Sequence, residues 1–426
     1  MKDHFVNWII HVDDKKIMKR STWWNLISST FNAGYTAILY FFVGWIVGGN
    51  AVGIVSIASA YAYQCLSIGV FGVRNVQASD VKKEYSFSDY FYLRIISCIF
   101  MYLVLLYYTF FQEYSFEKLS VVLIFGLFKS IEAIEDLYHG EYQRFDRLDI
   151  GCILQATRYF LSLIVFVILL FLSKDLILSF FISTLLSAAL CYVQNVWIIH
   201  AFVNEKIQFV RSKVRRLFFI CLPICIGNSV STYIVNMPKY AIDDMGNDIL
   251  QMQYGYLVLP ILTINLLSAV IYRPIVNKLS RFYYDGEFQR FFKEILKQMM
   301  IIGILTLIIV VGGYLIGLRL LGFIYGVDLM ESMPAFMVML IGGGLNTVSA
   351  FFVIVLTIQR AQNELLISYI VTLLVGVPIA ATLIQTYGIM GASILYLILS
   401  ICLDLLFGAF ILLAYYRKKR AVGESC

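Results

Sequence analysis

Charged residues are scarce in this sequence. Only 14% of its 426 residues are Asp, Glu, Lys or Arg, whereas 60% are hydrophobic. A soluble domain carries about a quarter charged residues, so the composition excludes an ordinary soluble protein. The mean hydropathy of +0.81 and a series of apolar runs of roughly 20 residues predict an all-α integral membrane protein.

The motifs of common enzyme classes are also missing. The dipeptide Gly-Lys does not occur, which excludes the phosphate-binding loop of ATP-driven motors, and neither G-x-S-x-G nor H-E-x-x-H is present. The eight cysteines lie in apolar runs or at the C-terminus, and the four histidines lack the spacing of metal ligands. We therefore expect a membrane transporter rather than an enzyme, with no disulfide framework, metal or cofactor.

Twelve apolar runs are long enough to span a membrane, and the outer connections between them are short. With the N-terminus in the cytoplasm, most of the 33 Lys and Arg residues fall in inner connections, as the positive-inside rule requires. The net charge of +6 therefore indicates membrane topology and not nucleic-acid binding. Both termini are predicted to be cytoplasmic, and the predicted spans are 21–46, 51–72, 90–111, 119–140, 150–172, 176–200, 217–237, 253–273, 298–318, 335–357, 365–386 and 390–414.

An internal repeat is predicted, with six spans in each half. Small polar residues form similar stripes in the first and seventh spans, where Asn32 and Asn236 occupy equivalent places and Asn228 lies two turns before Asn236. Such stripes either pack helices together or line opposite walls of one central cavity. All six prolines lie in the second half, which is the half expected to flex. The predicted organisation is a cytoplasmic N-terminal segment (1–20), an N-lobe (21–200), an inter-lobe loop (201–216), a C-lobe (217–414) and a basic cytoplasmic tail (415–426).

The fourth predicted span is exceptional because it contains four charged residues. Lys129, Glu132 and Asp136 share one face of this helix, and Glu135 lies ~120° away from Lys129. A charge near the bilayer midplane costs at least ~2.5 kcal/mol, so these side chains should face a protein interior or a water-filled path. Two interpretations remain open: a structural i, i+3 ion pair between Lys129 and Glu132, or a substrate or ion site in a transport pathway.

Among the further charges inside predicted spans, two are candidates for the site. Arg158 is at a depth similar to that of Glu132, and we expect the two to approach each other across an antiparallel hairpin. Spans four and five then contain two cations and three carboxylates, which leaves one excess negative charge for proton coupling. Asp404 in span twelve is another intramembrane acid, with no obvious partner. The ion-coupling candidates are thus Glu132, Glu135, Asp136 and Asp404.

Several segments resemble the polysaccharide flippases of the Wzx type, in the multidrug/oligosaccharidyl-lipid/polysaccharide (MOP) exporter superfamily. The segments are GEYQRFDRLDI (140–150), NMPKYAI (236–242), LLGFIYG (320–326), VLTIQRAQNE (355–364) and TYGIMGAS (386–393). The resemblance implies two six-helix lobes around a V-shaped cavity, in a bacterial inner membrane. It also implies the flipping of an undecaprenyl-diphosphate-linked oligosaccharide for O-antigen or capsule synthesis, driven by an ion gradient.

The resemblance also indicates partners and site residues. Expected partners are this lipid-linked glycan, membrane lipids and other polysaccharide-assembly proteins. Lys129 and Arg158 are the candidates for binding the diphosphate, with Asn32, Asn228 and Asn236 in the pathway.

Three alternatives compete with this interpretation. A multidrug exporter of the MATE kind often carries an acidic residue in span one, and this span one has none. A major-facilitator transporter would have a G-x-x-x-D-R-x-G-R-R loop after span two, which is absent. A membrane-embedded polymerase or acyltransferase would need a large outer loop with catalytic residues, and the predicted outer loops are too short for one.

Overall fold

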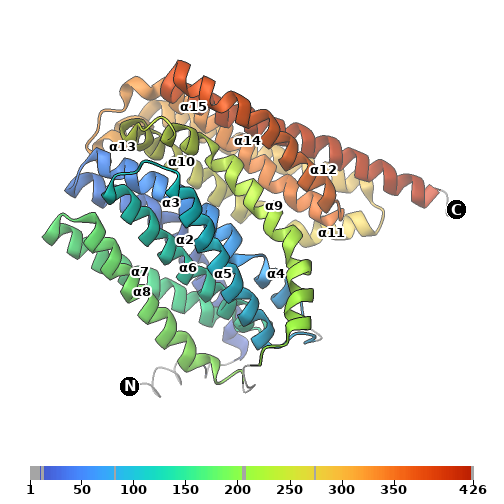
Figure 1. Cartoon of the computed structure of the whole chain (residues 1–426). Coiled ribbons are helices and arrows are strands. Elements are labelled where there is room, and N and C mark those ends of the chain that lie inside the picture. Colours follow the sequence, from blue (N-terminus) through green and yellow to red (C-terminus); the bar gives the residue numbers. More distant parts are fainter. Residues whose placement is uncertain (1–9, 11–13, 81–82, 204–207, 273–274, 424–426) are drawn as a thin grey trace. The chain divides into compact units, whose positions relative to one another are not determined.

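The computed structural model describes residues 10, 14–80, 83–203, 208–272 and 275–423, and the regular elements in these residues are all helices (Figure 1). Most of the predicted N-terminal segment 1–20 and residues 204–207 of the predicted inter-lobe loop lie outside the described residues. The chain divides into two compact units, Met1–Thr232 and Tyr233–Cys426. The predicted lobes, with their boundary at 201–216, remain a prediction.

The first unit contains seven helices and most of an eighth. They are α2 (Asp14–Ile46), α3 (Gly49–Val70), α4 (Val73–Ser79), α5 (Phe87–Phe110), α6 (Phe116–Arg144), α7 (Leu148–Ser173), α8 (Leu176–Ile199) and α9 (Arg211–Asp243), whose last turns belong to the second unit. The second unit continues with α10 (Asp248–Tyr272), α11 (Val276–Tyr284), α12 (Phe288–Gly312), α13 (Leu318–Tyr325), α14 (Met333–Ile358) and α15 (Gln362–Gly423).

Nine helices or helix runs in the described residues are long and apolar enough to cross a membrane. The longest helix, α15, has 62 residues and holds two predicted spans, which meet at Gly388 (φ 55°, ψ −128°). Two other predicted spans lie in helices outside these nine, α6 with 29 residues and α10 with 25 residues. Of the two, α6 contains the buried charged residues Lys129, Glu132 and Glu135. The all-α, membrane-spanning fold class is confirmed, and the predicted twelve spans are reached when α6, α10 and both arms of α15 are counted.

The structure differs from the sequence-based prediction at two connections. A short helix, α4, follows α3 where only a loop was expected, because positive φ angles at Phe71 and Gly72 end α3 and a new helix begins at Val73. The ninth predicted span ends at 318, but a five-residue π-helix, Gly313–Gly317, carries α12 directly into α13, so the helical run reaches Tyr325.

Side-chain caps mark where α5 and α6 begin. At the start of α5, Ser86 Oγ accepts a hydrogen bond from the Asp89 N–H at 3.3 Å, while Asp89 accepts one from the Ser86 N–H at 2.9 Å. At the start of α6, Ser115 Oγ accepts from the Lys118 N–H at 3.3 Å. The cap at Ser115 thus marks the residue at which α6 begins.

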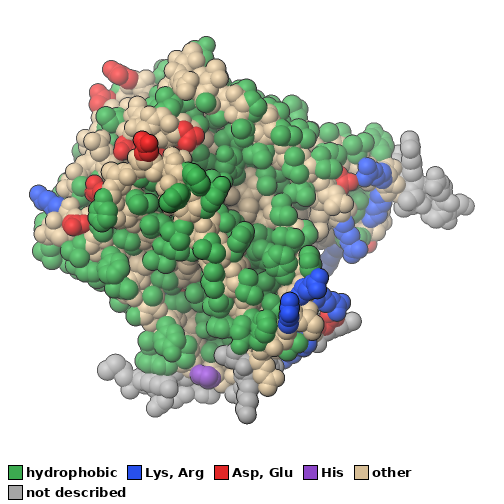
Figure 2. Space-filling view, in the orientation of Figure 1, with side chains coloured by type: hydrophobic (Ala, Val, Ile, Leu, Met, Phe, Trp, Pro, Cys, Tyr) green, Lys and Arg blue, Asp and Glu red, His purple; other side chains and the backbone are tan. Residues whose placement is uncertain are grey.

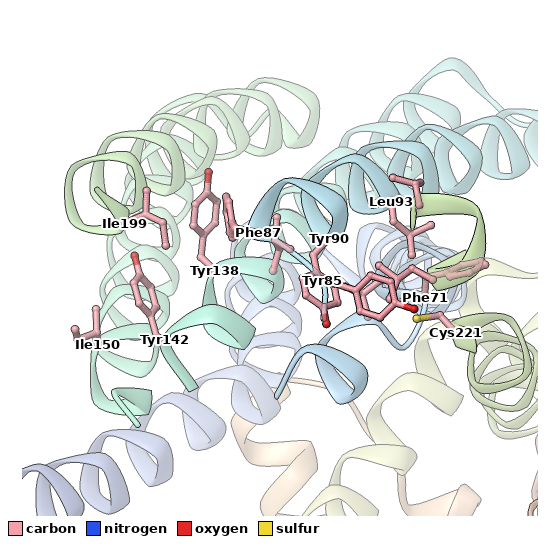
Figure 3. Packing of buried hydrophobic residues seen from close by; sticks show 14 of the residues in the cluster. Phe71, Tyr85, Phe87, Tyr90, Leu93, Tyr138, Tyr142, Ile150, Ile199 and Cys221 are labelled. Carbon is pink, nitrogen blue, oxygen red and sulfur yellow. The ribbon is translucent and has the colours of Figure 1, made fainter. Parts of the chain in front are cut away.

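Aromatic and aliphatic side chains form a buried cluster in the first unit (Figure 3). Phe87 of α5 packs on Tyr138 of α6, with 5.7 Å between the ring centroids. Phe71, after α3, stacks on Phe218 of α9 at 5.0 Å. The cluster joins α5 and α6 to the first half of α9 and includes α6 residues that directly follow its charged part.

Candidate functional site

The charged side chains of α6 are held in a network of ion pairs inside the first unit. Lys129 has no exposed surface, and its Nζ donates a hydrogen bond to Glu132 Oε2 at 2.6 Å. The same Nζ lies 4.0 Å from the centroid of the Tyr63 ring and 5.8 Å from that of Tyr159. The i, i+3 ion pair that the sequence left open is therefore formed, and two aromatic rings enclose its cation.

Arg158 of α7 is equally buried, but its carboxylate partner differs from the prediction. Its NH2 donates to Glu135 Oε2 at 2.7 Å, and its NH1 donates to Ser187 Oγ of α8 at 2.8 Å. The guanidinium carbon lies 4.5 Å from the centroid of the Tyr159 ring. Arg158 also approaches Glu132 closely enough for their charges to interact, as expected. Its direct ion-pair partner is nevertheless Glu135, because Glu132 is paired with Lys129.

Asp136 is shared by two arginines from outside α6 and α7. Arg94 of α5 donates to Asp136 Oδ2 at 2.9 Å and to the Gly69 carbonyl oxygen at 2.8 Å. Arg74 of α4 donates to Asp136 Oδ1 at 3.3 Å and to Gln143 Oε1 at 3.3 Å. These contacts place a carboxylate between two cations.

The charge balance of the whole network differs in sign from that of spans four and five. Spans four and five alone have an excess carboxylate, but Arg74 and Arg94 complete the network from α4 and α5. Four cations then face three carboxylates, Glu132, Glu135 and Asp136, in the described network. The site as a whole has an excess positive charge when all its groups are ionised.

A polar pocket of about 200 Å³ opens beside this network. Arg74 is the cation of the network that lines it, and about a third of its side chain (33%) is exposed. Ser28 and Gln155 are hydrogen-bonded to each other next to the pocket, and Cys152 Sγ lies 3.8 Å from Asn25 Oδ1. The lining residues are Asn25, Ser29, Asn32, Val70, Arg74, Glu132, Asp136, His139, Cys152 and Gln155.

The predicted site residues fall into three groups. Asn32, Glu132 and Asp136 line the polar pocket, and Lys129, Arg158 and Glu135 lie in the network behind it. Asn228 is exposed on the part of α9 in the first unit. Asn236 and Asp404 belong to the second unit, where Asp404 does have a partner: its Oδ1 accepts from Ser349 Oγ at 2.6 Å.

Three residues of the site were not predicted: Arg74, Arg94 and His139. Arg94 is visible in the sequence as a cation inside the third predicted span, at 90–111. Arg74 follows the second predicted span and was assigned to a cytoplasmic connection, where basic residues are common. His139 is buried on the same side of α6 as Asp136 and lines the pocket.

Comparison with known proteins finds no matching family model. Among curated proteins, the chain is 23% identical over 283 residues to the "Capsular polysaccharide biosynthesis protein CapF" of Staphylococcus aureus, which covers 65% of this chain and 70% of that protein. The likeness to solved structures is much more extensive. An inward-facing multidrug resistance MATE family transporter of the MOP superfamily superposes with a TM-score of 0.70 at 12% identity, covering 92% of this chain and 96% of that one.

Other MOP-superfamily structures agree with this one. An outward-facing MATE family transporter gives a TM-score of 0.60 at 13% identity and covers 99% of both chains. A MOP superfamily transporter from Pyrococcus furiosus, whose binding pocket is described as having reverse polarity, gives 0.61 at 13% identity and covers 97% of both chains. At 12–13% identity these likenesses show the fold, which is that of a multi-pass membrane protein. The chain has the fold of the MOP-superfamily transporters.

Proposed function

We propose that this protein is a flippase that moves an undecaprenyl-diphosphate-linked oligosaccharide across a bacterial inner membrane for the synthesis of a surface polysaccharide. Both termini are cytoplasmic in this proposal, and alternating access is coupled to an ion gradient. Two findings support it besides the transporter fold. One is the similarity to a capsular polysaccharide biosynthesis protein, and the other is the charge of the buried site.

The observation that carries the proposal is the excess positive charge beside a polar pocket. A diphosphate is a compact group with several negative charges, and guanidinium groups bind phosphate oxygens with paired, charge-assisted hydrogen bonds. Arg74 is partly exposed and lines the pocket, so it is the cation that a diphosphate would contact directly. Lys129, Arg94 and Arg158 have no exposed surface and contribute to the positive potential from behind.

Asp136 connects substrate binding to the ion gradient in this proposal. It holds Arg74 and Arg94 at once, so an arriving phosphate competes with Asp136 for Arg74. Protonation of Asp136 would release Arg74 and favour substrate binding, and deprotonation would have the opposite effect. Glu132 also lines the pocket and is the second group that a proton could reach, whereas Glu135 is almost completely buried.

A MATE-like exporter of organic cations is the second candidate. The solved structures with the same fold include multidrug MATE transporters, and the two pocket carboxylates, Glu132 and Asp136, could attract a cation. The excess of cations over carboxylates in the network favours the anionic substrate.

The decisive experiment analyses lipids and surface glycan of cells that lack this protein. The proposal predicts accumulated lipid-linked repeat units, loss of surface polysaccharide, and restoration of both by the unaltered protein but not by Arg74→Gln. Arg290→Gln is the matched control, because Arg290 is exposed and pairs only locally with Glu287. Normal glycan together with a new sensitivity to cationic dyes would reject the flippase and establish the drug exporter.

A further inference from the structure

One face of α9 in the first unit changes from basic to apolar along its length. At ~100° per residue, its members lie within an arc of about 120° on the helix. They are Arg211, Arg215, Phe218, Phe219, Leu222, Ile226, Ser229 and Val230. A helix face of this kind presents positive charge at one end and a hydrophobic surface at the other.

The basic end of this face borders a hollow of about 670 Å³. Arg211, Ser212, Arg215, Arg216 and Phe219 line it, and the Arg215 guanidinium carbon lies 6.0 Å from the centroid of the Phe219 ring. No ion pair with a carboxylate is found for these three arginines within the described residues. Figure 2 shows Lys and Arg side chains grouped over the beginning of α9, with hydrophobic side chains next to them. As far as the described residues show, an external anion at these arginines would not compete with a carboxylate.

The apolar end of the same face borders a second hollow, of about 480 Å³, between α3, α5 and α9. Ile68 of α3 and Phe71, which follows α3, form one wall. Leu93 and Phe100 of α5 and Leu222 of α9 form the others. Figure 3 shows Phe71 and Leu93 directed toward this part of α9. The volume is in the range of small-ligand sites, roughly 300–1,000 Å³.

The few hydroxyl groups at the apolar hollow are already hydrogen-bonded within the protein. Ser97 Oγ donates to the Gly69 carbonyl oxygen at 2.6 Å, and Ser229 Oγ accepts from Ser67 Oγ at 2.9 Å. A ligand there would find only hydrocarbon contacts. The hollow thus suits a hydrocarbon chain and offers no anchor for a polar group.

The distance between the two ends matches one leaflet of a bilayer. Arg215 and Ile226 are eleven residues apart, which corresponds to ~16 Å along a helix. Half of a ~30 Å hydrocarbon core is ~15 Å. A lipid whose phosphate lies at Arg215 would place its chain along Phe219 and Leu222 and end near the membrane midplane.

We propose that this face of α9, with α3 and α5, is a binding site for one anionic phospholipid of the leaflet at the N-terminal end of α9. The phosphate binds Arg211 and Arg215, and one acyl chain occupies the apolar hollow. The proposal depends on the membrane-spanning fold and on the charge of α9. It does not depend on the identity of the transported substrate.

Native mass spectrometry of the purified full-length protein tests the site, with dioleoylphosphatidylglycerol or dioleoylphosphatidylcholine added in detergent. We expect tighter binding of phosphatidylglycerol. Arg211→Gln/Arg215→Gln should weaken it by about 30-fold, from the usual contribution of two basic residues at an anionic membrane surface. The matched control, Arg290→Gln/Arg417→Gln, removes two exposed arginines elsewhere and should have no effect.

A second variant tests the apolar hollow. Leu222→Trp fills it and should weaken phosphatidylglycerol binding, whereas Leu374→Trp at an exposed position should not. If Leu222→Trp is not recovered as a monodisperse protein, Ile226→Phe serves the same purpose. Equal binding of the two lipids, or unchanged binding in the arginine variant, would overturn the proposal. Displacement of phosphatidylglycerol by a more tightly bound polyprenyl diphosphate would also overturn it, because the site would then belong to the substrate.

Discussion

The pair formed by Arg158 and Glu135 offers a sharp test of what the buried charges do. Both side chains are almost completely buried, and their N–O distance is 2.7 Å. Arg158→Met leaves the Glu135 carboxylate without its cation in an apolar interior. Breaking a buried ion pair in this way costs about 3–5 kcal/mol, which is a large part of a total folding free energy of about 5–15 kcal/mol.

Removal of both charges should be much less harmful. In Glu135→Leu/Arg158→Met, hydrocarbon of similar volume replaces the pair, and such replacements of buried ion pairs are often neutral or stabilising. We therefore expect low membrane abundance and a lowered melting temperature for Arg158→Met, and values close to those of the unaltered protein for the double variant. The measurement is the fraction of monodisperse protein after heating, with a fluorescent fusion in detergent, alongside a transport assay in cells.

The two roles of Arg158 give different patterns in this experiment. A purely structural pair predicts that the double variant recovers both abundance and transport. The double variant keeps the excess positive charge of the network, so recovered abundance without recovered transport would assign Arg158 itself a direct role in transport. Normal abundance and melting temperature in Arg158→Met would refute the reasoning, because the buried carboxylate would then tolerate the loss of its cation.

Two further predictions concern the stability of each unit. Gly391→Ala should reduce abundance, since an added Cβ would collide with the backbone carbonyl of Leu383, whereas Gly303→Ala has open space and should be neutral. In the first unit, burial raises the pKa of Asp80, but hydrogen bonds from backbone N–H groups and a nearby arginine outweigh burial and leave the pKa lowered. The carboxylate therefore stabilises the fold above its unfolded-state pKa, and this contribution is lost as the pH falls through the folded-state pKa. Melting temperatures of Asp80→Asn should be lower at neutral pH and should decline less below about pH 4 than those of the unaltered protein. Parallel melting curves for the two proteins would count against this role of Asp80.

Much of the fold could be predicted from the sequence because membrane spans are encoded locally. The apolar length of each span and the alternation of basic connections suffice to place most helices. Details that depend on the backbone in three dimensions were missed. The π-helix at Gly313–Gly317, which joins α12 to α13, has no simple sequence pattern, and neither does the short α4.

The charged site could be predicted only in part, for a related reason. Periodicity on α6 placed Lys129, Glu132 and Asp136 on one face, which depends on one helix alone. The partners of these charges come from other helices, and their approach depends on helix packing that a single sequence does not reveal. Arg74 in particular resembled an ordinary basic residue at a membrane surface, yet its guanidinium lies 3.3 Å from Asp136.

The distribution of these charges among the helices bears on mechanism. The three carboxylates lie on α6, whereas the cations come from α4, α5, α6 and α7. Apolar surfaces provide little net drive for helix association in lipid, so polar contacts of this kind fix which helices stay together. In the proposed flippase, a change at Asp136 alters the contacts of α6 with both α4 and α5 at once. A transport cycle that begins with a charge change in the pocket would therefore act first on these three helices.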